Sequence, residues 1–130
     1  HIGVADTIGV GTPRKVQAAI EATLKYYDLN DVSGHFHDTY GQALANTLAS
    51  LEMGVWQYDT SVAGLGGCPY AKGATGNVST EDVVYMLHGM GIDTGIDLDK
   101  LVDAGAFISD FLQRKSNSRV ATAVLTKRLD

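Results

Sequence analysis

The alternation of short apolar strands with amphipathic helices is the sequence feature that most constrains the fold of this chain. Three apolar segments are strand-like, at 1–6, 32–36 and 55–62. Four segments have the 3.6-residue apolar spacing or the opening signals of a helix, at about 13–27, about 41–53, 79–89 and about 98–113. Strands that alternate with helices of about 10–15 residues indicate βαβ units, and therefore a parallel sheet.

A parallel sheet of three strands has two open edges and too few helices to cover both of its faces. The sequence therefore predicts an α/β fold whose strands belong to a larger parallel structure. A (β/α)₈ barrel of about 250 residues would accommodate them, and a small doubly wound sheet is the alternative. The chain also begins at His1, without Met, directly on strand-like sequence, so we expect it to be a piece of a longer polypeptide.

The composition excludes several classes of protein. The 130 residues carry a formal net charge of −5, which argues against a sequence-independent grip on nucleic acid or on an anionic membrane. No apolar run approaches the roughly 20 residues of a membrane span. A single cysteine, Cys68, excludes an internal disulfide and a zinc site built from several cysteines.

Polar residues follow all three predicted strands, at the edge where parallel folds carry their active sites. Asp6 ends the first strand, His35 and His37 end the second, and Asp59 ends the third. Residues two apart on a strand project to the same side, so the two imidazoles form half of a metal site. The alternative is a histidine pair whose hydrogen bonds are satisfied within the protein.

The longest stretch without periodicity, 63–78, is rich in glycine and contains Cys68. Glycines let a backbone approach a ligand and let a loop move. A thiol in such a loop is a candidate acid, base or nucleophile, although a free cysteine is commonly an inert buried hydrophobe. Asn77 precedes the third predicted helix, so it is either a turn residue or an oxygen ligand for a hard cation such as Mg²⁺ or Mn²⁺.

Three segments of the chain are distinctive when taken together: DTIGVGTP at 6–13, HFHDTYGQALAN at 35–46 and SVAGLGGCPYA at 61–71. Together they resemble the hydroxymethylglutaryl-CoA lyase family. The resemblance continues through Gly76-Asn77 and TEDVVYML at 80–87, and it covers essentially the whole chain. It implies a (β/α)₈ barrel of which these strands are about the sixth, seventh and eighth. We then expect one partial catalytic domain over 1–130, with strand–helix units in 1–96, an active-site loop at 63–78 and a helical region at 97–130.

The resemblance also implies a reaction and the residues that perform it. The family cleaves 3-hydroxy-3-methylglutaryl-CoA to acetyl-CoA and acetoacetate with the help of a divalent cation, Mg²⁺ or Mn²⁺. Its metal ligands fall on His35, His37 and Asn77, and its catalytic loop cysteine falls on Cys68, the candidate proton donor. Its site aspartate falls on Asp6, which with His35 is a candidate base. The loop glycines are Gly64, Gly66 and Gly67.

The family's Arg-Asp-Gly motif, which supplies an arginine and a metal-binding aspartate, is absent from these 130 residues. We therefore expect the isolated chain to lack lyase activity. The alternatives are a condensing synthase or a carboxyltransferase of the same barrel superfamily, or a non-catalytic fragment. As partners we expect a small-molecule acyl-CoA and a second copy in a homodimer, with no nucleic acid and no membrane. The expected location is the bacterial cytoplasm, or the mitochondrial matrix of a eukaryote.

Overall fold

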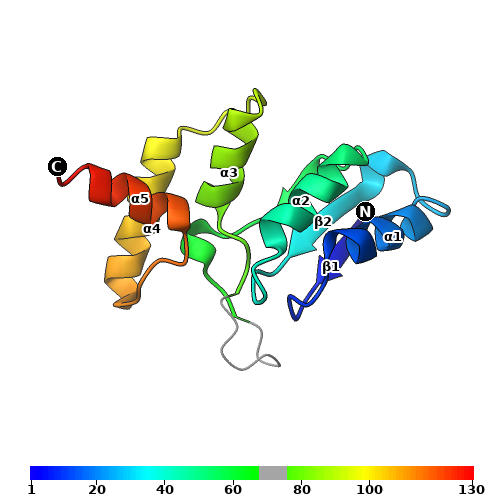
Figure 1. The fold of residues 1–130 in the computed structure, drawn as a ribbon, viewed down its shortest axis with the longest axis horizontal. Helices are drawn as coiled ribbons and strands as arrows, with labels where there is room; N and C mark the ends of the chain where they lie inside the picture. Colours follow the sequence, from blue (N-terminus) through cyan, green and yellow to red (C-terminus); the bar gives the residue numbers. More distant parts are fainter. Residues whose placement is uncertain (68–75) are drawn as a thin grey trace. The chain divides into compact units, whose positions relative to one another are not determined.

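The computed structural model describes residues 1–67 and 76–130, which form two compact units. Unit 1 comprises His1–Asp59 and Gly67–Asn77, and unit 2 comprises Thr60–Gly66 and Val78–Asp130. Figure 1 shows strands only in unit 1, whereas the part of unit 2 that the structure describes is helical.

Unit 1 is a three-stranded parallel sheet covered by two helices. Its strands are β1 (Ile2–Asp6), β2 (Val32–Phe36) and β3 (Gln57–Asp59), in the order β1-β2-β3. The helices α1 (Pro13–Thr23) and α2 (Ala43–Glu52) lie side by side against the sheet in Figure 1, and a 3₁₀ turn, η1 (Leu29–Asp31), leads into β2. This order confirms the predicted βαβ units. β2 is the most buried strand, because it is paired on both sides.

The core of unit 1 forms where the helices meet the sheet. Its fully buried large side chains include Ile20 from α1, Val32 and Phe36 from β2, and Val55. Gly34 is required for this packing, because a Cβ there would lie 2.8 Å from the Phe36 ring and 2.9 Å from the Tyr58 ring. The Tyr58 hydroxyl donates to the carbonyl of Val55 at 2.9 Å, and burial raises its pKa to about 12.

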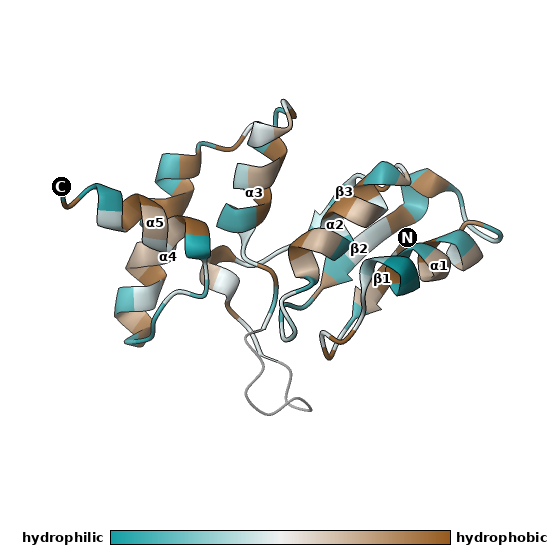
Figure 2. Ribbon diagram, in the orientation of Figure 1, coloured by the Kyte–Doolittle hydropathy of each residue, from teal (hydrophilic) through white to brown (hydrophobic). Residues whose placement is uncertain are grey.

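Unit 2 contains a 3₁₀ turn, η2 (Val62–Gly64), and three helices, α3 (Thr80–Gly89), α4 (Leu98–Leu112) and α5 (Arg119–Lys127). Each helix starts from a side-chain cap. Ser79 accepts from the Asp82 amide, Asp97 from the Lys100 amide and Ser118 from the Ala121 amide. Figure 2 shows brown apolar and teal hydrophilic segments on α4 and α5, as expected for helices with one buried side.

Three element boundaries differ from the sequence predictions. The first helix ends at Thr23 rather than near residue 27, and the third strand covers only Gln57–Asp59 of the predicted 55–62. The chain then turns at η2, where Ala63 has a left-handed φ of 59°. The helix α5 lies within the helical region expected at 97–130, although its own bounds were not predicted. Among the described residues, no helix is long and apolar enough to cross a membrane.

Candidate active site

The polar side chains that follow the strands of unit 1 gather at one edge of its sheet. Asp6 is opposite Phe36 in the β1–β2 register, and His35 is opposite Asp59 in the β2–β3 register. His37 follows β2 by one residue and forms an isolated bridge with Asn77. The structure therefore brings together Asp6, both histidines and Asn77, as the sequence predicted.

His35 is held from both sides of its ring. Its Nδ1 lies 3.1 Å from Asp59 Oδ2, and its Nε2 lies 2.8 Å from Asn77 Oδ1. A neutral imidazole has one N–H, so a ring that donates from Nδ1 to Asp59 presents the Nε2 lone pair to the Asn77 oxygen. A cation bound to both atoms would stabilise this arrangement, in which the two lone pairs face each other.

His37 is the more buried of the two histidines, with 7% of its surface exposed. Its ring stacks on that of His35, with centroids 5.6 Å apart and planes at 25°. Burial, and then the neighbouring His35, lower the pKa of His37, while Asp6 and Asn77 oppose that shift. The lowered pKa favours the neutral ring, which is the form that binds a metal.

The Asp6 carboxylate is fixed by the backbone of the turn that follows β1. Its Oδ1 accepts from the Val10 amide at 3.1 Å, and its Oδ2 accepts from the Gly11 amide at 2.8 Å. A Cβ on residue 11 would lie 2.9 Å from Asp6 Oδ2, so only glycine allows this approach. Because a carboxylate has about four lone-pair sites, Asp6 can still accept from another group.

These side chains fit a divalent cation as a partial site. Imidazole nitrogen, amide oxygen and carboxylate oxygen are ligands for Mg²⁺ and Mn²⁺ or for the metals that replace them. His37 Nδ1 is buried and has no hydrogen-bond partner. Within residues 1–67 and 76–130, however, no three side chains of His, Cys, Asp and Glu come together as a metal-binding group. The set therefore depends on Asn77 and has room for ligands from elsewhere.

Comparison with known proteins places these residues in a family. The HMGL-like family model matches residues 1–108. The chain belongs to the HMGL-like family. It is 58% identical over 123 residues to the mitochondrial hydroxymethylglutaryl-CoA lyase of Bos taurus, covering 95% of this chain and 38% of that protein. It is 51% identical over 130 residues to the cytoplasmic 3-hydroxy-3-methylglutaryl-CoA lyase of Rattus norvegicus, covering 100% of this chain and 38% of that protein.

Solved structures agree with this HMGL-like assignment. The hydroxymethylglutaryl-CoA lyase of Pseudomonas aeruginosa matches with a TM-score of 0.95 and 54% identity, over 98% of this chain and 42% of that one. The Acinetobacter baumannii lyase, solved with coenzyme A and 3-methylmalate, matches with a TM-score of 0.87 and 39% identity, over 94% of this chain and 40% of that one. The α/β fold, as part of a (β/α)₈ barrel, is thereby confirmed. The chain spans about two fifths of the length of these relatives.

The loop residues of this HMGL-like chain are only partly described. Gly64 and Gly66 have left-handed φ angles of 65° and 89°, and a Cβ on Gly67 would meet nothing within 4 Å. Cys68 lies outside the described residues. The roles predicted for the loop glycines and for Cys68 therefore stay predictions.

Sequence reasoning missed two buried polar side chains. Asn46 in α2 and Glu81 in α3 are both 0% exposed. Asn46 stands at a position that the helical period of α2 assigns to the core, and this was the signal that could have found it. Glu81 is flanked by Thr80 and Asp82 in the first turn of α3, so the sequence gives no such signal there. Their partners lie far away in sequence, Gly11 for Asn46 and Ala63 for Glu81.

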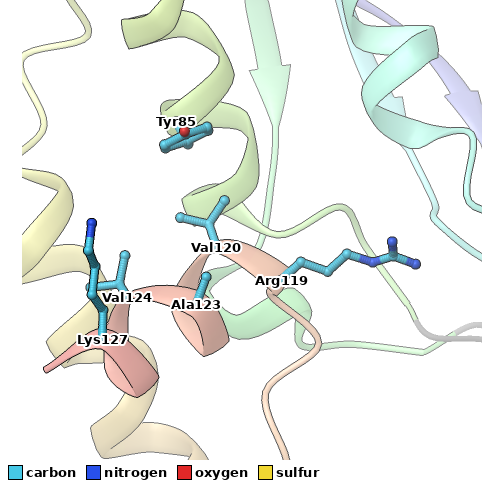
Figure 3. Close-up of a pocket in the computed structure, with 6 residues that line it drawn as sticks. All are labelled: Tyr85, Arg119, Val120, Ala123, Val124 and Lys127. Atoms are coloured by element: carbon cyan, nitrogen blue, oxygen red, sulfur yellow. The ribbon is translucent and has the colours of Figure 1, made fainter. Parts of the chain in front are cut away.

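Unit 2 has a hollow of a different kind, shown in Figure 3. It lies between α3 and α5, and it is lined by Tyr85, Arg119, Val120, Ala123, Val124 and Lys127. Its floor is apolar, and in Figure 3 the Arg119 guanidinium extends away from Val120 and Val124. Its lining holds no histidine and no carboxylate, so the polar cluster of unit 1 is the better candidate active site.

Proposed function

We propose that this chain supplies the metal-binding and thiol-bearing part of a hydroxymethylglutaryl-CoA lyase. The juxtaposition of His35, His37 and Asn77 at the carboxyl edge of a parallel sheet carries this proposal. The identity of 54–58% to lyases over almost the whole chain supports it. The proposed substrate is 3-hydroxy-3-methylglutaryl-CoA, and the products are acetyl-CoA and acetoacetate.

His35, His37 and Asn77 are the residues that would hold the cation, Mg²⁺ or Mn²⁺. When bound, a divalent cation lowers the pKa of a coordinated hydroxyl group and orients the bond to be broken. The Asp59 carboxylate, 3.1 Å from His35 Nδ1, fixes the ring so that Nε2 faces the site. An Nε2 lone pair committed to a cation cannot also accept a proton, so His35 is the weaker of the two candidate bases.

Asp6 is then the group that accepts the proton of the tertiary hydroxyl. The electrons of that O–H bond form the carbonyl of acetoacetate, and the adjacent carbon–carbon bond breaks. The pair from the broken bond forms the enolate of acetyl-CoA. The thiol of Cys68 protonates the enolate carbon and becomes a thiolate. Asp6 releases its proton to solvent and the thiolate takes one up, so both groups regain their starting protonation states. The two backbone N–H groups on Asp6 keep its carboxylate oriented through this exchange.

An acyl-CoA substrate is supported by the relative solved with coenzyme A. The homodimer, the choice between Mg²⁺ and Mn²⁺, and a location in the bacterial cytoplasm or the mitochondrial matrix are proposed on the family resemblance. Relatives that are named mitochondrial and relatives that are named cytoplasmic both exist, so membership of the family is compatible with either compartment.

A chimera tests the function directly. In it, this chain replaces the matching segment of the Pseudomonas aeruginosa lyase, to which it is 54% identical. We expect the chimera to release acetoacetate from 3-hydroxy-3-methylglutaryl-CoA in the presence of Mg²⁺, and the 130-residue chain alone to release none. The Cys68→Ala variant of the chimera should lose turnover by orders of magnitude and still bind metal.

Two results would contradict the proposal. A folded, metal-binding chimera without acetoacetate release would show that this chain is not lyase-competent. Exchange of acetyl-CoA protons without cleavage would indicate a condensing synthase instead.

A further inference from the structure

Asn46 is a buried polar side chain to which the proposed chemistry assigns no role. It lies in the first turn and a half of α2 and is 0% exposed. Its Nδ2 donates to the carbonyl of Gly11 at 3.1 Å, and its Oδ1 is buried without a partner. Asparagine is a poor helix former, and an unpartnered buried acceptor is costly, so the position needs a reason other than the stability of α2.

Gly11 connects Asn46 to the candidate active site. The carbonyl of Gly11 accepts from Asn46, while its amide donates to Asp6 Oδ2 at 2.8 Å. The same residue also makes the close approach to Asp6 that a Cβ would prevent. Gly11 thus accepts a hydrogen bond from a side chain of α2 and donates one to the Asp6 carboxylate of the site.

The other hydrogen bonds of the turn between β1 and α1 are made by backbone groups and by Asp6 itself. The Gly9 amide donates to the Asp6 carbonyl at 3.3 Å, and the Tyr40 amide donates to the Gly9 carbonyl at 3.3 Å. Gly9 has a left-handed φ of 70°, a conformation that glycine adopts without strain. The hydrogen bond from Asn46 reaches this turn from α2 and is made by a fully buried side chain.

We propose that Asn46 is a positioning residue of the active site: through Gly11 it fixes the turn at 7–12, and through that turn it fixes the Asp6 carboxylate at the end of β1. The inference rests on the proposed function for its consequence, because Asp6 is the proposed base. The connection itself is a property of this chain and can be measured without substrate or metal.

Amide hydrogen exchange of the ¹⁵N-labelled chain tests the connection. Asn46→Asp keeps the shape of the side chain and removes the donor, and Asn46→Ala serves if the buried charge prevents folding. We expect the Gly11 amide to exchange about tenfold faster in either variant, relative to the Phe36 amide of β2. The matched control is Thr47→Ala, which removes a neighbouring side chain that is 1% exposed and bonds only within α2, to the Ala43 carbonyl. It should leave that ratio within about twofold.

Turnover of the chimera with the Pseudomonas aeruginosa lyase tests the consequence for the site, because Asp6 is the proposed base and is not one of the proposed metal ligands. The kcat of the chimera should fall about tenfold in the Asn46 variants while KM and Co²⁺ affinity stay unchanged, and Thr47→Ala should change none of these quantities.

Each result has a distinct meaning. A Gly11 exchange rate that follows Phe36 in the Asn46 variants would overturn the inference. Faster exchange with an unchanged kcat would also overturn it, because Asn46 would then hold the turn and not the site. If the wild-type chimera releases no acetoacetate, the proposed function fails, and the exchange ratio alone decides whether Asn46 fixes the turn that holds Asp6.

Discussion

Unit 1 and unit 2 both bury polar side chains, but they satisfy them differently. In unit 2, Glu81 is 0% exposed and both of its carboxylate oxygens lie 3.0 Å from the Ala63 amide. Asp82 accepts from the Ser118 hydroxyl at 2.7 Å and from the Val120 amide at 3.0 Å. These carboxylates join α3 to η2 and to α5, so their hydrogen-bonding capacity is used inside the unit.

Unit 1 leaves part of its hydrogen-bonding capacity unused. Among the described residues, the buried atoms without a partner are His37 Nδ1, Thr39 Oγ1 and Asn46 Oδ1 in unit 1, and Ser109 Oγ in unit 2. Stable proteins tolerate few such atoms, and His37 Nδ1 lies in the polar cluster that follows β2, as expected of a site prepared for a ligand. The buried carboxylates of unit 2 therefore stabilise the fold, whereas buried polar atoms of unit 1 are available to bind a ligand.

Among the substitutions that test this contrast, His37→Ala in the chimera is expected to have the largest effect, a loss of turnover. Turnover should fall about a thousandfold, because a bound cation contributes several kcal/mol to transition-state stabilisation. The free energy of unfolding should fall by only about 1–2 kcal/mol, the ordinary cost of truncating a buried side chain. Steady-state kinetics and urea unfolding measure the two quantities. A large loss of stability with near-normal turnover would show that His37 holds the structure.

Asp82→Ala in unit 2 is expected to lower stability without changing metal binding. Removing the acceptor for the Ser118 hydroxyl and the Val120 amide should lower the free energy of unfolding by about 2–3 kcal/mol and leave Co²⁺ affinity unchanged. Asp99→Ala is the matched control, because its side chain is 80% exposed in its ion pair with Arg128 and should contribute less than about 0.5 kcal/mol. Equal losses of unfolding free energy in Asp82→Ala and Asp99→Ala would show that the buried hydrogen bonds of Asp82 do not stabilise unit 2.

Asp59→Asn sharpens the comparison within unit 1. Asp59 is exposed and lies 3.1 Å from His35 Nδ1, so its loss should weaken Co²⁺ binding about tenfold and change stability by less than about 0.5 kcal/mol. Isothermal titration calorimetry measures the affinity. Asp28→Asn, an exposed carboxylate of the same unit, is the control and should have no effect on binding. Similar affinities for both variants would mean that Asp59 does not orient His35.

The smallest effect concerns the pH dependence of unit 2. Burial raises the pKa of Glu81, so the folded state binds its proton more tightly than the unfolded state does. The contribution of Glu81 to stability is therefore fully present below the ordinary carboxyl pKa and is lost as pH rises through the raised value. The Glu81→Gln variant lacks this loss. Its free energy of unfolding, relative to wild type, should rise between pH 4 and pH 7 in urea titrations, and a constant difference would contradict the role of burial.

The features that depend on patterns of neighbouring residues could be predicted from the sequence. Apolar periodicity predicted the βαβ order, and the polar residues after each strand predicted that Asp6, His35 and His37 would meet, because parallel strands end at a common edge. Asn46 and Glu81 escaped prediction, since their roles depend on partners 35 and 18 residues away. The bounds of α5 within the expected helical region at 97–130 could not be predicted, because its first turn is anchored by Asp82, 36 residues before Ser118.

The glycine that precedes His35 has a consequence for recognising distant relatives. Because a Cβ at Gly34 would lie within 2.9 Å of two rings, the backbone and the chemistry are tied together in four consecutive residues, Gly34 to His37. A search signature for chains that can build this site is therefore G-H-x-H rather than H-x-H alone. Sequences that keep both histidines but replace the glycine should carry their imidazoles on a differently packed sheet. Such sequences should be classified separately in a phylogeny.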